Sequence, residues 1–434
     1  ADMPKIGSHF DLPIALALLA ALDIIPADDA ARTVALGELS LNGDLVAVVG
    51  ALPAAMAAAT EDRQLLCPHA CGAEAAWVGN ARVIAPRSLA AVIRHFNGKS
   101  VLAPSEPGEV RGPARARDLS EVKGQERAKR ALEIAAAGRH HLLLVGSPGS
   151  GKSMLAARIP GILPPLTPTE ALETSMIHSV SGLLDEGGIN RERPFREPHH
   201  TASMAAIVGG GRGAKPGEIS LAHNGVLFMD EFPEFPRTVL ETLRQPIETG
   251  EVIVARANAH VKYPCRFMLV AAANPCKCGY LTDPARACSR APICGEDYMG
   301  RISGPLMDRF DLRVEVPPVA FTDLDLPQSG ESSASVAARV AKARQAQTDR
   351  YAASSHVRVN ADAEGQILEQ FATPDAEGRA LLTRVAERFG LSARGYHRVL
   401  RVARTIADLE GSDTVHQPHV AEAVSYRLAL SKEV

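Results

Sequence analysis

Aromatic side chains are scarce in this sequence. Phe, Trp and Tyr make up 4% of the 434 residues, and Trp77 is the single tryptophan, so a surface that stacks nucleic-acid bases on aromatic rings is not an obvious theme. An excess of charge of one sign is also missing, since 47 Lys and Arg stand against 50 Asp and Glu. This balance excludes a nucleic-acid binder that is basic along its whole length, but it leaves room for a local basic patch.

Long hydrophobic runs are missing as well. The longest one near the start, 12–25, is interrupted by Pro13 and Asp23, so it is too short to span a bilayer. It also lacks the basic flank and cleavage site of a signal peptide. With 46% hydrophobic and 22% charged residues, disordered, collagen-like and coiled-coil chains are excluded. We expect a cytoplasmic, soluble, multi-domain protein with no membrane partner. Because the first residue is Ala and a helical pattern follows almost at once, we also expect that the natural N-terminus has been removed.

The pattern of helices, strands and loops divides the chain. Residues 1–102 alternate small helices with short apolar strands, and residues 103–118 contain prolines, glycines and scattered charge typical of a linker. Residues 119–318 alternate strands and helices, which predicts an α/β domain with a parallel sheet. A second soft stretch, 319–335, leads into residues 336–434, which we expect to contain helices only.

A phosphate-binding loop is the sharpest motif. It follows the apolar strand 142–145 and precedes a helix expected over 154–159, and its Gly residues allow backbone N–H groups to wrap a phosphate. Lys152 would reach the β- and γ-phosphates of ATP, and Ser153 would bind Mg²⁺. The nucleotide-binding residues are Gly146, Ser147, Pro148, Gly149, Ser150, Gly151, Lys152 and Ser153.

Acidic and amide side chains follow two further apolar strands. Asp230 and Glu231 end the apolar strand 225–231; Asp230 would hold Mg²⁺ through its water shell, and Glu231 would polarise the attacking water. This pair favours ATP hydrolysis over phosphoryl transfer to a small molecule. Asn274 ends the strand 267–273 and either senses the γ-phosphate or forms a turn with Pro275. Arg309, in the stretch 303–311, is a candidate arginine finger for a neighbouring subunit, which requires an oligomer.

Taken in order, these motifs resemble those of AAA+ ATPases of the magnesium-chelatase-like branch. Three stretches look like signatures of its ComM/YifB subfamily: 196–203, 216–223 and 402–409. The resemblance covers nearly the whole chain from Gly7. It implies a P-loop ATPase core, a C-terminal helical lid, and a truncated N-terminal α+β domain of the ChlI type, similar to the Lon protease domain. It also implies a hexameric ring that acts as an ATP-driven DNA branch-migration helicase in natural transformation. Arg394 looks like the sensor 2 of the family, with Arg398 as the alternative; a solvated basic stripe is the third interpretation.

Two loops could grip a DNA backbone in the channel of such a ring. The segment 209–213, with Arg212 and Lys215 close by, resembles the loop that projects into the channel in this branch. A hairpin predicted over 248–262 carries Arg256 and Lys262. Basic loops of this kind bind phosphates without reading sequence. The alternative is that both are ordinary surface loops.

Four of the seven cysteines, Cys276, Cys278, Cys288 and Cys294, lie in one Gly- and Pro-containing segment. They could hold a structural Zn²⁺ through four thiolates, or stay reduced and unligated, since a single intervening residue is tighter than usual zinc spacing. For Cys67, Cys71 and Cys265 we expect ordinary packing.

Several functions compete at this point. In the Lon-like N-terminal segment, Ser8 would be the nucleophile, but Pro53 stands where the partner Lys should be, and a serine without a base is a weak nucleophile. Proteolysis is therefore disfavoured, and the segment is expected to be a ring or substrate-handling element. The leading hypothesis is an ATP-dependent DNA motor with ATP and Mg²⁺ as cofactors. The rivals are a metal-chelatase motor subunit and an ATPase that remodels proteins and never touches DNA.

Overall fold

The computed structural model describes residues 8–110, 117–184, 188–211, 214–256, 259–281, 285–319, 330–354 and 356–428. The chain divides into two compact units, residues 1–113 with 166–192, and residues 114–165 with 193–434. The segment 166–192 was expected within the ATPase core, but its contacts are with the N-terminal residues. Among the described residues, no helix has the length and apolar character needed to cross a membrane.

The N-terminal unit is built on a small parallel sheet in the order β1-β4-β5, with strands Thr33–Ala35, Gln64–Leu66 and Val83–Ile84. Its helices are α1 (Asp11–Ala21), α2 (Ala27–Ala31), α3 (Ala51–Thr60), α4 (His69–Ala75), α5 (Leu89–Phe96) and the later α8 (Pro168–Ser181). A short hairpin pairs β2 (Glu38–Leu39) with β3 (Leu45–Val46). Helix α8 packs on α3, and buried Glu74 accepts hydrogen bonds from the Leu52 N–H and the Ser179 hydroxyl. Pro53 lies in the first turn of α3, where proline is tolerated.

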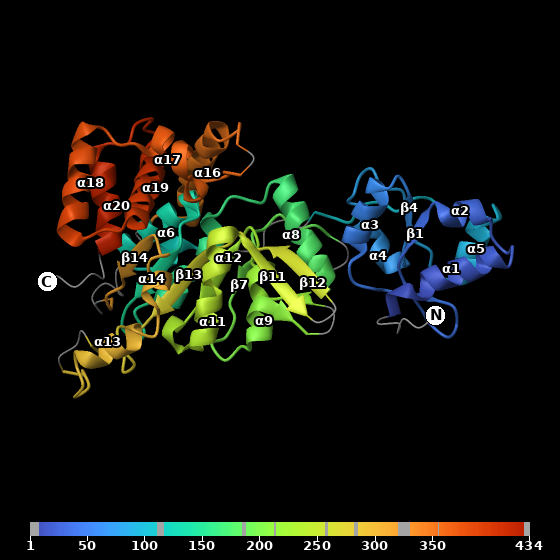
Figure 1. Cartoon of the computed structure of the whole chain (residues 1–434), viewed down its shortest axis with the longest axis horizontal. Helices are drawn as coiled ribbons and strands as arrows, with labels where there is room; N and C mark the ends of the chain where they lie inside the picture. Colours follow the sequence, from blue (N-terminus) through green and yellow to red (C-terminus); the bar gives the residue numbers. More distant parts are fainter. Residues whose placement is uncertain are drawn as a thin grey trace. The chain divides into compact units, whose positions relative to one another are not determined.

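The ATPase core contains a five-stranded sheet in the order β14-β6-β13-β10-β7 (Figure 1). All four strand pairs are parallel. The strands are β6 (Leu142–Val145), β7 (Phe195–Arg196), β10 (Val226–Met229), β13 (Met268–Ala273) and β14 (Leu312–Glu315). Strands β6, β10 and β13 are buried throughout, as expected for parallel strands covered on both faces. The predicted parallel α/β core is confirmed.

Short helices and two hairpins surround this sheet. The helices are α6 (Glu126–Gly138), α7 (Lys152–Ala156), α9 (Met204–Val208), α10 (Glu218–Leu221), α11 (Arg237–Thr242), α12 (Arg244–Thr249), α13 (Ile293–Met299) and α14 (Gly304–Met307). Helix α7 ends at Ala156, earlier than expected, and a separate 3-10 turn follows at Ile159–Ile162. The hairpins pair β8 (Gly209–Gly210) with β9 (Lys215–Pro216), and β11 (Glu251–Arg256) with β12 (Ala259–Pro264). The second is the predicted hairpin, although it begins at Glu251.

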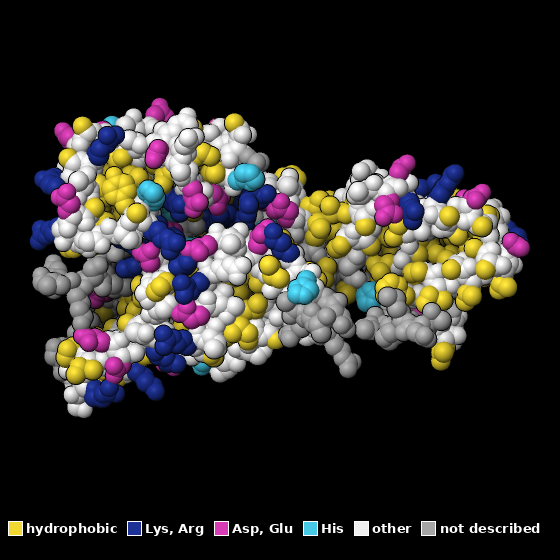
Figure 2. All heavy atoms as spheres, in the orientation of Figure 1, with side chains coloured by type: hydrophobic (Ala, Val, Ile, Leu, Met, Phe, Trp, Pro, Cys, Tyr) yellow, Lys and Arg dark blue, Asp and Glu magenta, His cyan; other side chains and the backbone are white. Residues whose placement is uncertain are grey.

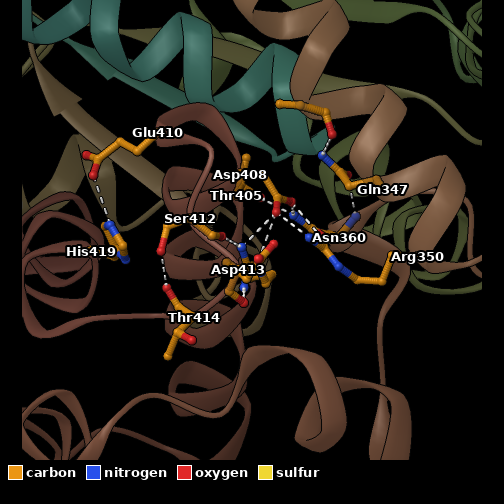
Figure 3. A network of polar contacts seen from close by, with 12 residues as sticks. Gln347, Arg350, Asn360, Thr405, Asp408, Glu410, Ser412, Asp413, Thr414 and His419 are labelled. Atoms are coloured by element: carbon orange, nitrogen blue, oxygen red, sulfur yellow. Dashed lines mark hydrogen bonds and ion pairs between the residues drawn. The ribbon is translucent and has the colours of Figure 1, made fainter.

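The C-terminal part is helical, as expected: α16 (Ser333–Arg350), α17 (Gly365–Ala372), α18 (Ala376–Phe389), α19 (Ala393–Glu410) and α20 (Gln417–Leu428). Figure 1 shows these helices gathered beside α6. Buried side chains of α6, the sheet and α19 form one continuous apolar cluster. Arg404 forms an ion pair with Asp408 within α19. Arg350 of α16 also pairs with Asp408, and Asn360 donates to Asp408 at 2.8 Å (Figure 3). The Arg350–Asp408 pair connects α16 with α19, and the buried charges there are paired rather than isolated.

Candidate functional site

The phosphate loop follows β6 at the carboxyl edge of the parallel sheet. Gly146 has no room for a side chain, since a Cβ atom there would lie 2.2 Å from the carbonyl oxygen of Val316. Gly151 has a φ of 91° directly before α7, a conformation that favours glycine. The loop can therefore turn tightly from strand to helix, and it leads directly into the start of α7, where backbone N–H groups can bind an anion.

Lys152 and Asn274 lie together, as their positions after neighbouring strands predict. The Lys152 ammonium group donates to the carbonyl oxygens of Gly146 and Ser147 at 2.8 and 3.0 Å, and to Asn274 Oδ1 at 3.1 Å. Burial lowers the pKa of Lys152, while Asp230 and Glu231 oppose that shift. The arrangement holds a cation and an amide beside the loop, where they can contact terminal phosphates.

The two candidate Mg²⁺ residues also meet. The Ser153 hydroxyl donates to Asp230 Oδ2 at 2.5 Å, and the Glu231 N–H donates to Asp230 Oδ1 at 2.8 Å. Glu231 itself has a φ of 50°, which is uncommon for a residue with a side chain and turns it away from the direction of β10. Oxygen ligands from a hydroxyl and a carboxylate suit Mg²⁺, so these residues fit the expected cofactor.

His200 is a neighbour of Glu231 that the sequence analysis did not assign. Its Nδ1 lies 3.2 Å from Glu231 Oε2, and its ring stands beside that of His199, with 4.1 Å between centroids. The cause is topological: β7 pairs in parallel with β10, so the residues that follow the two strands lie side by side. Glu197 is in the same segment, and burial together with the nearby Asp230 raises its pKa. The sequence signal that could have pointed to His200 and Glu197 was the stretch 196–203, which resembles a subfamily signature.

A bidentate ion pair joins two signature stretches. Arg196 donates to both oxygens of the Glu218 carboxylate, at 2.6 and 2.8 Å. Arg196 ends β7 and Glu218 begins α10, so this pair holds the end of the strand in place, and two parallel N–H···O bonds also fix its direction. The His200 segment is thereby anchored beside the acidic pair.

A cleft of about 860 Å³ opens beside the phosphate loop, which is within the range of small-molecule sites. Its lining includes Ser147, Pro148, Tyr280, Leu281, Met299 and Val316. The cleft could hold the less polar part of a ligand whose phosphates rest on the loop.

Arg309 and Arg394 lie at the opposite edge of the sheet, where the parallel strands begin. Arg309 precedes β14, and the last residue of β14 pairs with Val145, which directly precedes the phosphate loop. The four residues of β14 therefore put about 13 Å of strand between Arg309 and the level of the phosphate loop, at 3.3 Å per residue. Arg309 donates to the carbonyl of Pro305 at 2.5 Å and forms an ion pair with Glu248. Arg394 Nη1 lies 3.9 Å from the same Glu248 carboxylate. The structure thus brings the two arginines together, at the edge remote from their own phosphate loop.

The C-terminal helices hold the segment that carries Arg309. Arg398 donates to Asp311 Oδ1 at 2.6 Å and to the carbonyl of Arg309 at 3.0 Å. Arg427 donates to the carbonyls of Asp308 and Phe310 at 3.1 and 2.7 Å. Burial alone would raise the pKa of Asp311, but Arg398 and the hydrogen bond with His140 hold it well below its ordinary value. Arg398, the alternative sensor 2, is thus engaged within its own chain, and Arg427 is a residue that sequence reasoning missed.

The cysteine segment brings together side chains that could hold a metal. The sulfur atoms of Cys276, Cys278 and Cys294 lie within 4.8 Å of one another, and Cys288 is close enough to influence the pKa values of Cys278 and Cys294. Hydrogen bonds from Cys276 and from nearby backbone lower the pKa of Cys278 to about 6. Three thiol groups at such spacing, with Cys288 as a nearby fourth, fit the preferences of Zn²⁺. Cys67, Cys71 and Cys265 are buried elsewhere, in agreement with ordinary packing.

The residues proposed for DNA contact are only partly described. Lys215, in β9, is exposed, and Lys262, in β12, is also exposed and pairs with Glu251 at 2.5 Å. Arg212 lies outside the described residues, as does the side chain of Arg256. The structure therefore places two of the four basic residues on hairpins at the surface, and their role in DNA binding stays a prediction.

The sheet, the phosphate loop and the acidic pair define a P-loop nucleotide-binding protein of the AAA+ type. A family model described as magnesium chelatase, subunit ChlI matches residues 118–324, its C-terminal counterpart matches 330–427, and a model of subunit ChlI of Mg-chelatase matches 1–71. The chain belongs to this magnesium-chelatase ChlI-like family, which confirms the resemblance seen in the sequence.

The similarity to individual proteins agrees with this family assignment. Competence protein ComM of Haemophilus influenzae is 43% identical over 98% of this chain and 84% of its own length. YifB of Escherichia coli is 43% identical over 98% of this chain and 83% of its own. The magnesium-chelatase 38 kDa subunit of Rhodobacter capsulatus is 27% identical over 71% of this chain and 87% of its own. The similarity to ComM and YifB thus extends over nearly the whole chain.

Proposed function

We propose that this protein is a ring-forming ATPase that uses ATP hydrolysis to move DNA and promotes branch migration in recombination or natural transformation. The observation that carries the ATPase part is the cluster at the carboxyl edge of the sheet, where Lys152 contacts Asn274 and Ser153 contacts Asp230. In this proposal Lys152 binds the β- and γ-phosphates, and Ser153 and Asp230 hold Mg²⁺. Glu231 accepts a proton from the attacking water, and Asn274 orients that water or contacts the γ-phosphate.

The opposite edge of the sheet supports an oligomer. Arg309 and Arg394 share Glu248 on that edge, which supports the proposal that each serves a nucleotide bound to a neighbouring copy. A heterologous interface of this kind closes into a ring when the rotation between copies allows it. We propose a homo-hexamer in which every interface combines one phosphate loop with the arginine pair of the next subunit.

DNA is the proposed substrate because of the similarity to a competence protein and because exposed Lys215 and Lys262 lie on hairpins of the core. We expect single-stranded or branched DNA to raise the ATPase rate, with Glu231→Gln as the blank. The stimulation should fall as salt rises, because binding to DNA backbone phosphates releases counterions. An active ATPase that is indifferent to every DNA tested would contradict the DNA motor and favour a protein remodeller.

A second candidate is a motor subunit of metal-chelatase type. It is favoured by the 27% identity with the magnesium-chelatase 38 kDa subunit. The similarity to ComM and YifB, which extends further along this chain, favours the DNA motor. Stimulation of the ATPase by a porphyrin-binding partner protein, in place of DNA, would reverse this order.

We also propose that the cysteine segment holds one structural Zn²⁺. Elemental analysis of purified protein should find about one zinc per chain, as in four-thiolate sites, and Cys278→Ser or Cys294→Ser should lose it. Cys265→Ser is the matched control, because Cys265 is buried away from the cluster. Metal-free protein with four freely titratable thiols in this segment would contradict the proposal.

A further inference from the structure

One carboxylate, that of Glu248, contacts both arginines proposed to act on a neighbouring subunit. It forms an ion pair with Arg309 and lies 3.9 Å from Arg394. The Arg309 side chain is only 6% exposed, while Glu248 is 44% exposed. Arg309 cannot reach a group on another molecule while it stays in this position. The contact with Glu248 must therefore break before Arg309 acts.

The surroundings of Glu248 are rich in positive charge. Glu248 lines a cleft of about 620 Å³ between the core and the C-terminal helices, and Figure 2 shows basic side chains along the hollow between these parts. Basic residues in its lining are Arg139, Arg266, Arg394, Arg398 and Arg401. Other acidic side chains there have nearby basic partners: Asp311 is bound by Arg398, Asp362 by Arg139, and Glu364 by Arg401. Glu248 differs because it faces the two candidate trans-acting arginines.

A carboxylate and a phosphate oxygen compete for the same N–H donors. Arginine binds both groups with its planar guanidinium, in similar geometry and with similar bond lengths. Glu248 therefore takes the place at Arg309 that a phosphate of a neighbour's nucleotide would occupy. While Glu248 stays there, the neighbour's hydrolysis lacks this arginine.

The position of Glu248 is tied to the hairpin β11–β12. Helix α12, which carries Glu248, ends at Thr249, and β11 begins at Glu251. Between them, Gly250 has a φ of 68°, donates to the carbonyl of Pro246 at 2.9 Å and accepts from the N–H of Cys265 at 2.8 Å. These bonds join the end of α12 to both strands at the base of the hairpin. Only Thr249 and Gly250 separate Glu248 from β11, so a displacement of the hairpin would also move Glu248.

We propose that Glu248 is a positioning residue that restrains Arg309 and Arg394 until the hairpin β11–β12 is displaced by a DNA strand. The proposal rests on the proposed ring ATPase and adds a route from DNA to catalysis. DNA bound to the hairpin of one subunit shifts α12, frees its two arginines, and so accelerates ATP hydrolysis at the neighbour's site.

The test is the steady-state ATPase of the full chain carrying Glu248→Gln, with and without single-stranded DNA. We expect the DNA-free kcat to rise roughly tenfold, because a charge-assisted bond that restrains Arg309 is weakened, with KM for ATP unchanged and little further stimulation by DNA. Glu364→Gln is the matched control, since its carboxylate pairs with Arg401 in the same cleft and contacts neither candidate arginine; we expect wild-type kinetics. The double variant with Arg309→Ala should lose the gain.

Glu248→Asp guards against misfolding, since it keeps the charge on a shorter arm. Its DNA-free kcat should lie between those of the wild type and Glu248→Gln. If the DNA-free kcat of both variants is no higher than that of the wild type, the proposal is overturned. If DNA stimulates the wild type while the DNA-free kcat of both variants is unchanged, the DNA motor is supported and the restraint by Glu248 is rejected. A raised DNA-free rate with a wild type indifferent to DNA would support the restraint and remove the DNA motor.

Discussion

Replacing Glu231 with glutamine is expected to lower kcat for ATP hydrolysis by about 10²- to 10⁴-fold, the usual contribution of a positioned general base. Glutamine keeps the size of the side chain but cannot accept a proton from water. Affinity for ATP should stay close to that of the wild type, because Lys152, Ser153 and Asp230 are unchanged. Fluorescent-nucleotide titration and single-turnover hydrolysis measure the two quantities separately.

Lys152→Ala is the contrasting variant. It removes the ammonium group that contacts Gly146, Ser147 and Asn274, so we expect it to abolish ATP binding itself. Normal turnover in Glu231→Gln would show that Glu231 is not the catalytic base. His200 lies 3.2 Å from Glu231, but we expect a lower rate if His200 has to act as the base in its place.

Much of the nucleotide site could be predicted because each part of it is local in sequence. The phosphate loop is a single continuous motif, and Asp230 and Asn274 each follow a buried apolar strand. Once those strands are assigned to a parallel sheet, their carboxyl ends must share one edge. The contacts Lys152–Asn274 and Ser153–Asp230 lie at that edge, as the rule leads one to expect.

Other contacts depend on strand order and helix packing, which periodicity does not reveal. The pairing of β7 with β10 brings His200 to Glu231, and a different neighbour for β10 would have put another residue there. The clamp of Arg427 on Asp308 and Phe310 joins residues more than a hundred positions apart. Helix α8 packs with the N-terminal unit, and this too is a long-range contact that a helical pattern does not reveal.

The sheet separates two chemical roles along the same strands. One edge carries the groups proposed to bind and activate ATP, and the other carries Arg309, Arg394 and Glu248. Arg398 links the second edge to the C-terminal helices by its bonds to Asp311 and Arg309. A motion of these helices would therefore reach the arginines before it reached the chain's own phosphate loop. In the proposed ring, this arrangement would link the C-terminal helices to the neighbour's nucleotide.

Arg309→Ala is expected to leave ATP binding intact and to lower hydrolysis in assembled rings by about 10³- to 10⁵-fold, as for other arginine fingers. The reason is that the developing charge on the γ-phosphate loses its stabilising guanidinium. Thermal unfolding of the variant checks that loss of a buried side chain has not unfolded the chain. Rates measured across a dilution series separate an effect on catalysis from an effect on assembly.

A mixing experiment decides where Arg309 acts. Glu231→Gln subunits keep Arg309, and Arg309→Ala subunits keep Glu231, so each variant alone lacks one half of every site. If Arg309 serves the neighbouring subunit, equal mixing of the two should make about a quarter of the interfaces complete in a head-to-tail ring, and activity should reappear. If Arg309 serves its own site, every subunit in the mixture stays defective and no activity returns. Since Arg309 stands at the far end of β14 from the phosphate loop, recovery is the expected result.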